Sequence, residues 1–261
     1  MRTQRRVQIR LVTGVAASLL AIAGVTVGSS LPALAAPPAG KAVSTYVALG
    51  DSYAAGQGGE GSLGACGRTA SGYPSVLDAD HAYKLLRDVS CAGVVTAGLR
   101  ATQLTALNPG VKVVTVTVGG NDLRFESLGS ACTEGFGSDA CLAAVARAAD
   151  LLPALGPQLV ETYSAIAAAA PRATIVVTGY PALVAETAIL DATTALNDTI
   201  RDAVAAVRAR GADIRFADVM TPFLGHGIGS AQPWIVAAGP DALHPTTEGY
   251  RAFARAIAAV L

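Results

Sequence analysis

Short apolar runs alternate with longer helical stretches along this chain, and one run is apolar at nearly every position. That run, Val111–Val118, is typical of a strand buried on both faces of a parallel sheet. Other brief runs are bounded by Gly, Pro or Asn and are also interpreted as strands: Thr45–Leu49, Asp88–Cys91, Ala173–Thr178 and Asp213–Val219. The alternation predicts an α/β fold, a three-layer α/β/α sandwich around a mostly parallel five-stranded sheet.

The stretches between the strands predict helices at Tyr73–Leu86, Cys141–Ala170, Leu190–Arg210 and Thr246–Leu261. Pro153 and Pro157 should interrupt the second of these. His81 falls inside the first, which suggests a structural role for that side chain.

The first 35 residues have the features of a secretory signal peptide. Arginines precede an apolar stretch at Leu11–Val27, and Ala33-Leu34-Ala35 offers a cleavage site. We therefore expect residues 36–261 to form one secreted domain, with no stable membrane span after cleavage. An uncleaved membrane anchor is the alternative, and the arginine pair at Arg5-Arg6 leaves the export route open.

Charge and cysteine content limit the possible partners. All 19 acidic residues but only 15 of the 19 basic residues lie beyond residue 35, so residues 36–261 carry a net charge of −4. No basic patch stands out, which argues against nucleic acid as a partner. The four cysteines suit two disulfides in an exported chain, and of three possible connectivities Cys66–Cys91 with Cys132–Cys141 is the simplest. No metal site is expected, because the sequence has no C-x2-C and no histidine near either pair.

Polar and glycine residues follow the first three predicted strands. Ser52 follows the first strand, Gly93 the second, and Gly120-Asn121 the third. In open α/β sheets, ligands bind beyond the carboxyl ends of the strands. A serine there can act as a nucleophile and an asparagine amide can donate to an oxyanion. Taken singly, each also fits an ordinary role, a helix N-cap for Ser52 and a turn for Asn121.

A serine nucleophile needs a base, and His244 is the preferred candidate among three histidines. Asp241 lies three residues upstream, a spacing at which its carboxylate can reach Nδ1 and leave Nε2 facing the serine. A backbone carbonyl near Trp234 could orient the ring instead. His226 is the rival base, in a glycine-rich loop whose nearest upstream acid is Asp218.

These motifs together resemble the SGNH (GDSL-type) hydrolase family, whose fold is flavodoxin-like. Gly50-Asp51-Ser52-Tyr53 is similar to its first block, with tyrosine where leucine is often found, and Asp241-x-x-His244-Pro245 to its fifth. The resemblance implies Ser52 as nucleophile, His244 as base and Asp241 as the residue that orients His244. It also implies an oxyanion hole formed by the Ser52 and Gly93 N–H groups and the Asn121 side chain. Gly98 competes with Gly93 for the second-block position. No cofactor is implied.

Within that family, the chain is similar to secreted actinobacterial lipases and esterases, including in the placement of its cysteines. One difference is the absence of a third disulfide that such relatives often carry near the loop after His226, so loops that should wall the pocket differ here. The resemblance implies that the chain acts on lipid or short-to-medium acyl esters. We also expect a monomer. Apolar loop residues suit such substrates: Leu123, Phe125, Phe223, Leu224 and Ile235.

Three alternatives are weighed against this hypothesis. A carbohydrate O-deacetylase would use the same site residues. A catalytically silent binding module would be expected to lack Ser52, Asn121 or His244, and all three are present. The tract Gly56–Gly61 matches the G-x-G-x-x-G of dinucleotide-binding proteins, but it does not directly close the first strand or open a clear helix. We interpret this tract as a rim of the active site.

Overall fold

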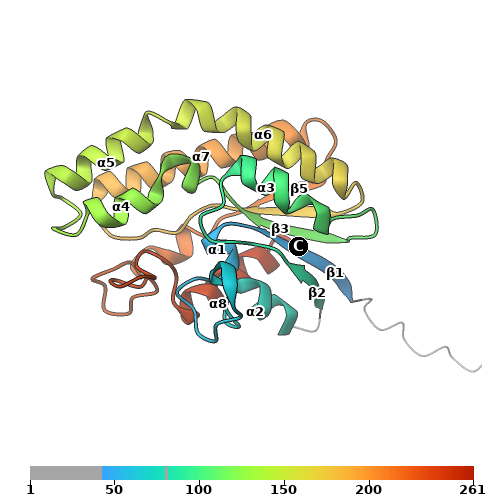
Figure 1. Ribbon diagram of the computed structural model, residues 1–261, viewed down its shortest axis with the longest axis horizontal. Helices are drawn as coiled ribbons and strands as arrows, with labels where there is room; N and C mark the ends of the chain where they lie inside the picture. The colour runs from blue at the N-terminus through green and yellow to red at the C-terminus, as the bar shows by residue number, and fades with distance from the viewer. Residues whose placement is uncertain (1–42, 80–81) are drawn as a thin grey trace, which may run out of the picture. The chain divides into compact units, whose positions relative to one another are not determined.

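The computed structural model describes residues 43–79 and 82–261, and its strands form one parallel sheet (Figure 1). The strand order is β2-β1-β3-β4-β5, as in flavodoxin-like folds. The strands are β1 Ser44–Gly50, β2 Tyr83–Asp88, β3 Val113–Thr117, β4 Thr174–Thr178 and β5 Ile214–Ala217. The predicted three-layer fold with five parallel strands is therefore confirmed.

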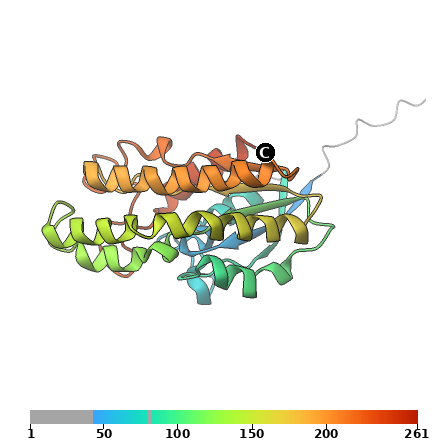
Figure 2. The same ribbon diagram turned by 90° about the horizontal axis from the view of Figure 1, so that it is seen from above.

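Helices cover both faces of the sheet, as Figures 1 and 2 show. One face carries α1 Ser52–Ala55, α2 Tyr73–Ala79 and α8 Thr247–Ala258. The other carries α3 Thr96–Thr102, α4 Phe125–Ala131, α5 Asp139–Ala149, α6 Leu152–Ala169 and α7 Thr187–Arg208. Short 3₁₀ turns lie at Ala65–Gly67, Leu104–Ala106, Asn121–Leu123 and Thr221–Phe223.

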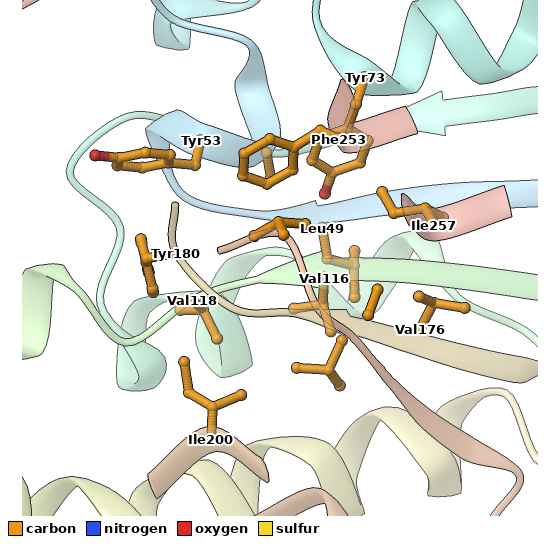
Figure 3. Close-up of a cluster of buried hydrophobic side chains, with 14 of the residues drawn as sticks. Leu49, Tyr53, Tyr73, Val116, Val118, Val176, Tyr180, Ile200, Phe253 and Ile257 are labelled. Carbon is orange, nitrogen blue, oxygen red and sulfur yellow. The ribbon is translucent and has the colours of Figure 1, made fainter. Parts of the chain in front are cut away.

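The core lies on both sides of the three central strands (Figure 3). Every residue of β3 is buried, as the unbroken apolar run predicted. On the α2/α8 face, the Tyr73 and Phe253 rings stack with their centroids 5.8 Å apart. On the other face, Ile200 of α7 is fully buried. Burial on both faces fixes the strands, and their carboxyl ends therefore form a rigid platform.

The second strand differs from its prediction. The helix expected over Tyr73–Leu86 ends at Ala79, and the strand expected at Asp88–Cys91 lies instead at Tyr83–Asp88. This strand is at the edge of the sheet, and its alternation of half-buried and exposed residues lacks the continuous apolar signal of β3. His81 lies outside the described residues.

The predicted helix at Cys141–Ala170 is two helices, α5 and α6, with the break at residues 150–151. Pro153 occupies the first turn of α6, where its missing N–H costs nothing. Pro157 lies inside α6 without ending it. Its missing N–H removes one hydrogen bond near the start of an 18-residue helix.

Two disulfides, Cys66–Cys91 and Cys132–Cys141, follow the sequential pairing. The described residues, 43–79 and 82–261, belong to one compact unit, and the predicted signal peptide at residues 1–35 lies outside the described part of the chain. Within that part, no single helix is long and apolar enough to span a membrane; the bent pair α5 and α6 meets the length and composition requirement together.

Candidate active site

Ser52 and Asn121 lie beyond the carboxyl ends of β1 and β3, two neighbouring strands whose register pairs Gly50 with Thr117. The chain leaves β1 toward β2 on one side and leaves β3 toward β4 on the other, so a crevice opens between the two turns. Asp51 caps the short helix α1, its Oδ1 accepting a 2.9 Å hydrogen bond from the Tyr53 N–H. Asp51 is thus the cap, and Ser52 is the first helical residue, 7% exposed.

The structure brings Ser52 and His244 together across 192 positions of sequence, with His244 Nε2 2.8 Å from Ser52 Oγ. The Tyr53 ring packs against the imidazole at a centroid distance of 4.9 Å. The Tyr53 hydroxyl donates to the Leu243 carbonyl at 2.6 Å. Tyr53 therefore joins the serine turn to the segment that carries the histidine.

Backbone carbonyls contact the other nitrogen of His244. Nδ1 lies 3.1 Å from the Ala242 oxygen and 3.3 Å from the Asp241 oxygen. Because a carbonyl oxygen can only accept, the proton belongs on Nδ1, and the Nε2 lone pair faces Ser52. The Asp241 carboxylate makes no hydrogen bond to the ring among the described residues. The residue Asp241 lines a separate polar hollow of about 350 Å³, together with Gly58 and Arg68.

The turn that aims the imidazole uses a left-handed residue. Leu243 has φ of 69°, a conformation uncommon for a bulky side chain. Its N–H donates to the Val236 carbonyl at 2.9 Å and its own carbonyl accepts from Tyr53. These two hydrogen bonds hold the residue next to His244 in this conformation.

Burial lowers the pKa of His244 below its ordinary value. The two carbonyls at Nδ1 and the nearby charge of Asp241 oppose this effect without cancelling it. A base with a lowered pKa is already neutral, and so able to accept the serine proton, at mildly acidic pH.

Three donors surround the crevice beside Ser52. The N–H groups of Ser52 and Gly93 form no hydrogen bond with any residue in the described ranges. The Asn121 Nδ2 donates one hydrogen bond to the Val94 carbonyl at 2.9 Å, which fixes the amide and leaves its second N–H. Gly93, Asn121 and Ser52 line the same cleft. Gly98, the competing glycine, lies within α3 and does not line this cleft.

His226, the rival base, lies elsewhere. Its ring stacks on Trp234 with centroids 3.7 Å apart, and its Nδ1 lies 2.9 Å from the Gln232 carbonyl oxygen. It does not line the cleft that holds Ser52.

Gly58, in the glycine-rich tract Gly56–Gly61, packs closely against His244 and Pro245. Gly58 has φ of 90°, and a Cβ there would lie 2.7 Å from the Pro245 oxygen and 3.0 Å from the His244 Cβ. A side chain at Gly58 would therefore displace the residues that set the histidine. Gln57 of this tract lines the cleft, whereas Gly58 and Gly59 line the hollow that Asp241 borders.

A buried carboxyl lies under the nucleophile. Asp51 is 1% exposed, and burial raises its pKa to about 7, although hydrogen bonds from Tyr180, Tyr53 and Ala54 act to lower it. The Tyr180 hydroxyl donates to Asp51 Oδ2 at 2.5 Å and accepts from the Gly120 N–H at 2.8 Å. This hydroxyl joins the turn after β1 to the turn after β3.

The cleft has a volume of about 740 Å³. Residues 129–136, at the end of α4 and the start of the Cys132–Cys141 loop, supply much of its wall, and residues 237–243 face them. An apolar chamber of about 50 Å³ adjoins it under α4, α5 and α7. The two spaces share five lining residues: Phe125, Cys132, Phe136, Leu183 and Leu243.

Of the five apolar loop residues that the sequence suggested for substrate binding, only two line the cleft or the apolar chamber. Leu123 and Phe125 line the chamber. Phe223 and Ile235 are buried in the core, and Leu224 is 54% exposed, so these three do not line the cleft or the chamber. The expectation was wrong for these three residues, because Phe223 and Ile235 pack into the core and Leu224 is exposed to solvent.

Sequence reasoning did not find Tyr180 or the 129–136 wall. A signal for Tyr180 existed, since Gly179-Tyr180-Pro181 directly follows the predicted strand Ala173–Thr178. The carboxyl-end rule, applied there as it was to the first three strands, would have selected it. Among the residues that the structure describes, no group of three or more His, Cys, Asp or Glu could hold a metal ion.

Several known proteins are similar to this chain in sequence and in fold. The model of the GDSL-like Lipase/Acylhydrolase family matches residues 48–252. A lipase of Streptomyces rimosus is 37% identical over 241 residues, 84% of this chain and 89% of the relative. The crystal structure of phospholipase A1 from Streptomyces albidoflavus NA297 has a TM-score of 0.77 at 30% identity, covering 84% of this chain and all of that one. The structure of an extracellular lipase from Streptomyces rimosus has a TM-score of 0.76 at 32% identity, with the same coverage.

Proposed function

This chain belongs to the GDSL-like lipase/acylhydrolase family and is an ester hydrolase; on that premise, we propose that it is a secreted serine esterase or lipase. Its substrates are lipid or short-to-medium acyl esters, cleaved through an acyl-Ser52 intermediate. The 2.8 Å contact between His244 Nε2 and Ser52 Oγ is the observation that carries this proposal.

In the first half of the reaction, His244 Nε2 takes the proton of Ser52 Oγ as that oxygen bonds to the ester carbonyl carbon. The carbonyl oxygen gains the negative charge and accepts hydrogen bonds from the Ser52 and Gly93 N–H groups and Asn121 Nδ2. The carbon–alkoxy bond then breaks, and His244 returns its proton to the leaving alkoxide. The alcohol departs and the acyl group stays on Ser52.

In the second half, a water gives its proton to His244 and its oxygen bonds to the acyl carbon. The bond to Ser52 Oγ breaks, the serine recovers the proton from His244, and the carboxylic acid leaves. The Ala242 and Asp241 carbonyls accept from Nδ1–H throughout, and they stabilise the imidazolium with partial rather than full negative charge.

The apolar chamber supports an acyl chain as the part of the substrate bound deepest. Its lining is almost entirely apolar and includes side chains of α5 and α7. It joins the cleft at Phe125, Phe136 and Leu243. An acetyl group on a sugar would leave this chamber unused, so we favour acyl esters over the carbohydrate O-deacetylase alternative.

Export is supported by the signal features of residues 1–35 and by the two disulfides, which persist in oxidising compartments. The Streptomyces rimosus lipase of known structure, 32% identical to this chain, is an extracellular lipase. The chain expressed with its own N-terminus should appear in the medium shortened by about 35 residues. Retention of the full-length chain in the cell membrane would contradict export with cleavage.

One substrate panel tests the reaction. Chromogenic esters from acetyl to dodecanoyl and acetylated xylan are offered to the wild-type protein, with Ser52→Ala as the blank. We expect turnover of the acyl esters and nearly none by Ser52→Ala. Release of acetate from xylan alone would favour the deacetylase, and no turnover of any substrate would favour a binding module.

The chamber is tested by filling it. Ala148 of α5 lines the chamber, whereas Ala146 of the same helix is exposed. Because each buried methylene contributes about 0.8 kcal/mol, loss of room for two should lower the octanoyl-to-acetyl ratio of kcat/KM about tenfold in Ala148→Leu. Ala146→Leu is the matched control and should keep the wild-type ratio. An unchanged ratio in Ala148→Leu would show that the acyl chain binds elsewhere.

A further inference from the structure

The Tyr180 hydroxyl lies between the two turns that supply the reacting groups. It donates to Asp51 Oδ2 at 2.5 Å and accepts from the Gly120 N–H at 2.8 Å. Asp51 directly precedes Ser52, and Gly120 directly precedes Asn121. One side-chain oxygen therefore connects the residues next to the nucleophile and next to the amide donor.

Tyr180 is itself held firmly. Asn197 of α7 accepts a 2.7 Å hydrogen bond from the Tyr180 N–H and donates a 2.9 Å hydrogen bond to the Tyr180 carbonyl. The Tyr180 ring meets the Tyr53 ring edge-on at 5.0 Å, an arrangement also visible in Figure 3. With its backbone clamped and its ring packed, the hydroxyl has a fixed position from which to hold the two turns.

We propose that Tyr180 is a positioning residue for ester hydrolysis, acting through Asp51 and Gly120 on Ser52 and Asn121. This role rests on the proposed function of Ser52 and Asn121. The hydroxyl sets the distance between the nucleophilic oxygen and the amide that receives the oxyanion. Without it, one oxygen of Asp51 and the Gly120 N–H lose their partner, and the two turns are free to shift.

Such a shift affects the transition state more than the bound substrate. Errors of about 1 Å in the placement of reacting groups cost on the order of 10² in rate. The hydroxyl is occupied by Asp51 and Gly120, so its removal takes no hydrogen bond from the ester. Tyr180→Phe should therefore lower kcat about 10- to 100-fold and leave KM within about twofold.

The chain offers a matched control in Tyr163 of α6. Tyr163 is fully buried, and within residues 43–79 and 82–261 its hydroxyl has no hydrogen-bond partner. Tyr163→Phe removes a buried phenolic oxygen without cutting a connection between the two turns. It should keep the wild-type kcat and KM.

The test measures kcat and KM for p-nitrophenyl butyrate, together with the Kd of an alkyl boronic acid, for wild type, Tyr180→Phe and Tyr163→Phe. A boronic acid forms a tetrahedral adduct with a serine and so reports on placement of the oxyanion donors. We expect the boronate Kd of Tyr180→Phe to rise by about the factor by which kcat falls. The proposal is overturned if kcat stays within twofold of wild type, if kcat falls while boronate affinity is unchanged, or if Tyr163→Phe shows the same loss.

Asp51→Asn provides a second variant of similar size, also usable if Tyr180→Phe does not fold. If both residues act through one connection, the double variant should lose no more than about threefold beyond the worse single variant. If the fold-losses in kcat of the two single variants multiply in the double variant, Tyr180 and Asp51 do not act through one connection. If wild type hydrolyses no ester, the proposed function fails, whereas the ratio of boronate affinities across these variants still decides the role of Tyr180.

Discussion

The cleft that holds Ser52 has a floor built from strand ends, and the loop at residues 225–246, here called the His244 loop, forms the side that carries His244. The floor comprises the turns after β1, β3 and β4 and is fixed by buried strands and the Tyr180 hydroxyl. The His244 loop holds itself by backbone contacts: Trp234 N–H to the His226 carbonyl at 2.7 Å, Val236 N–H to the His244 carbonyl at 2.9 Å, and a bridge between Ile235 and Pro245.

The difference shows how the two halves of the site tolerate change. In the floor, the side chains of Asn121 and Tyr180 make hydrogen bonds that substitution can delete, so we expect those substitutions to remove transition-state stabilisation directly. In the His244 loop, the groups that orient the imidazole are backbone carbonyls, which substitution does not delete. We therefore expect the loop to depend strongly on His244 itself and weakly on its neighbours.

The largest effect should come from the one side chain of the loop that reacts. His244→Ala removes the proposed base and should lower kcat by about 10⁴-fold or more, close to the effect of Ser52→Ala. Steady-state hydrolysis of a short-chain ester measures it. His226→Ala is the matched control and should keep more than half of the activity. A greater loss in His226→Ala than in His244→Ala would overturn the choice of base.

In the floor, Asn121→Ala should lower kcat about 10²- to 10³-fold, the usual cost of losing one oxyanion donor. KM should change little, because the donor acts on charge that develops during the reaction. The melting temperature of the variant separates this effect from unfolding. A loss confined to KM would mean that Asn121 binds the ground state and would remove it from the oxyanion hole.

Tyr53 tests the contact between floor and loop. Its hydroxyl donates to the Leu243 carbonyl next to His244 at 2.6 Å. Tyr53→Phe should lower kcat about tenfold or less, since one hydrogen bond contributes about 0.5–1.5 kcal/mol. Tyr83→Phe, on the edge strand β2, is the control. If Tyr53→Phe had no effect on kcat, the loop would be positioned without the floor.

The smallest effect should come from Asp241. The charge of Asp241 raises the pKa of His244, so Asp241→Asn should lower that pKa further. The neutral imidazole then persists to lower pH, and the acidic limb of the kcat/KM profile moves to lower pH. At pH 8 we expect kcat within about threefold of wild type, because the Ala242 and Asp241 carbonyls still accept from Nδ1. A loss equal to that of His244→Ala would mean that the carboxylate contacts the ring during catalysis.

Much of the floor was predictable from the sequence. The apolar run at Val111–Val118 identified β3, and the carboxyl-end rule selected Ser52, Gly93 and Asn121, which line one cleft. The edge strand was less predictable, because Tyr83–Asp88 is only half buried and has no strong apolar pattern. No local sequence pattern at residues 129–136 indicates that they line the cleft, because this depends on how α4 and the Cys132–Cys141 loop pack over the ends of β1 and β3.

The sequence by itself determined the fold class and named Ser52, Gly93, Asn121 and His244, which line one cleft. It left three disulfide connectivities open and favoured the simplest, which is the one observed. Apolar runs indicate the buried strands and the residues next to their carboxyl ends, whereas the pairing of Ser52 with His244 rests on the resemblance to a known family. The tertiary structure decided which atoms meet. It places the backbone carbonyls of Asp241 and Ala242 at Nδ1 in place of the Asp241 carboxylate, and it sets the Tyr180 hydroxyl between two turns. These contacts depend on backbone angles such as the left-handed Leu243 and on packing between distant segments, which no local pattern encodes.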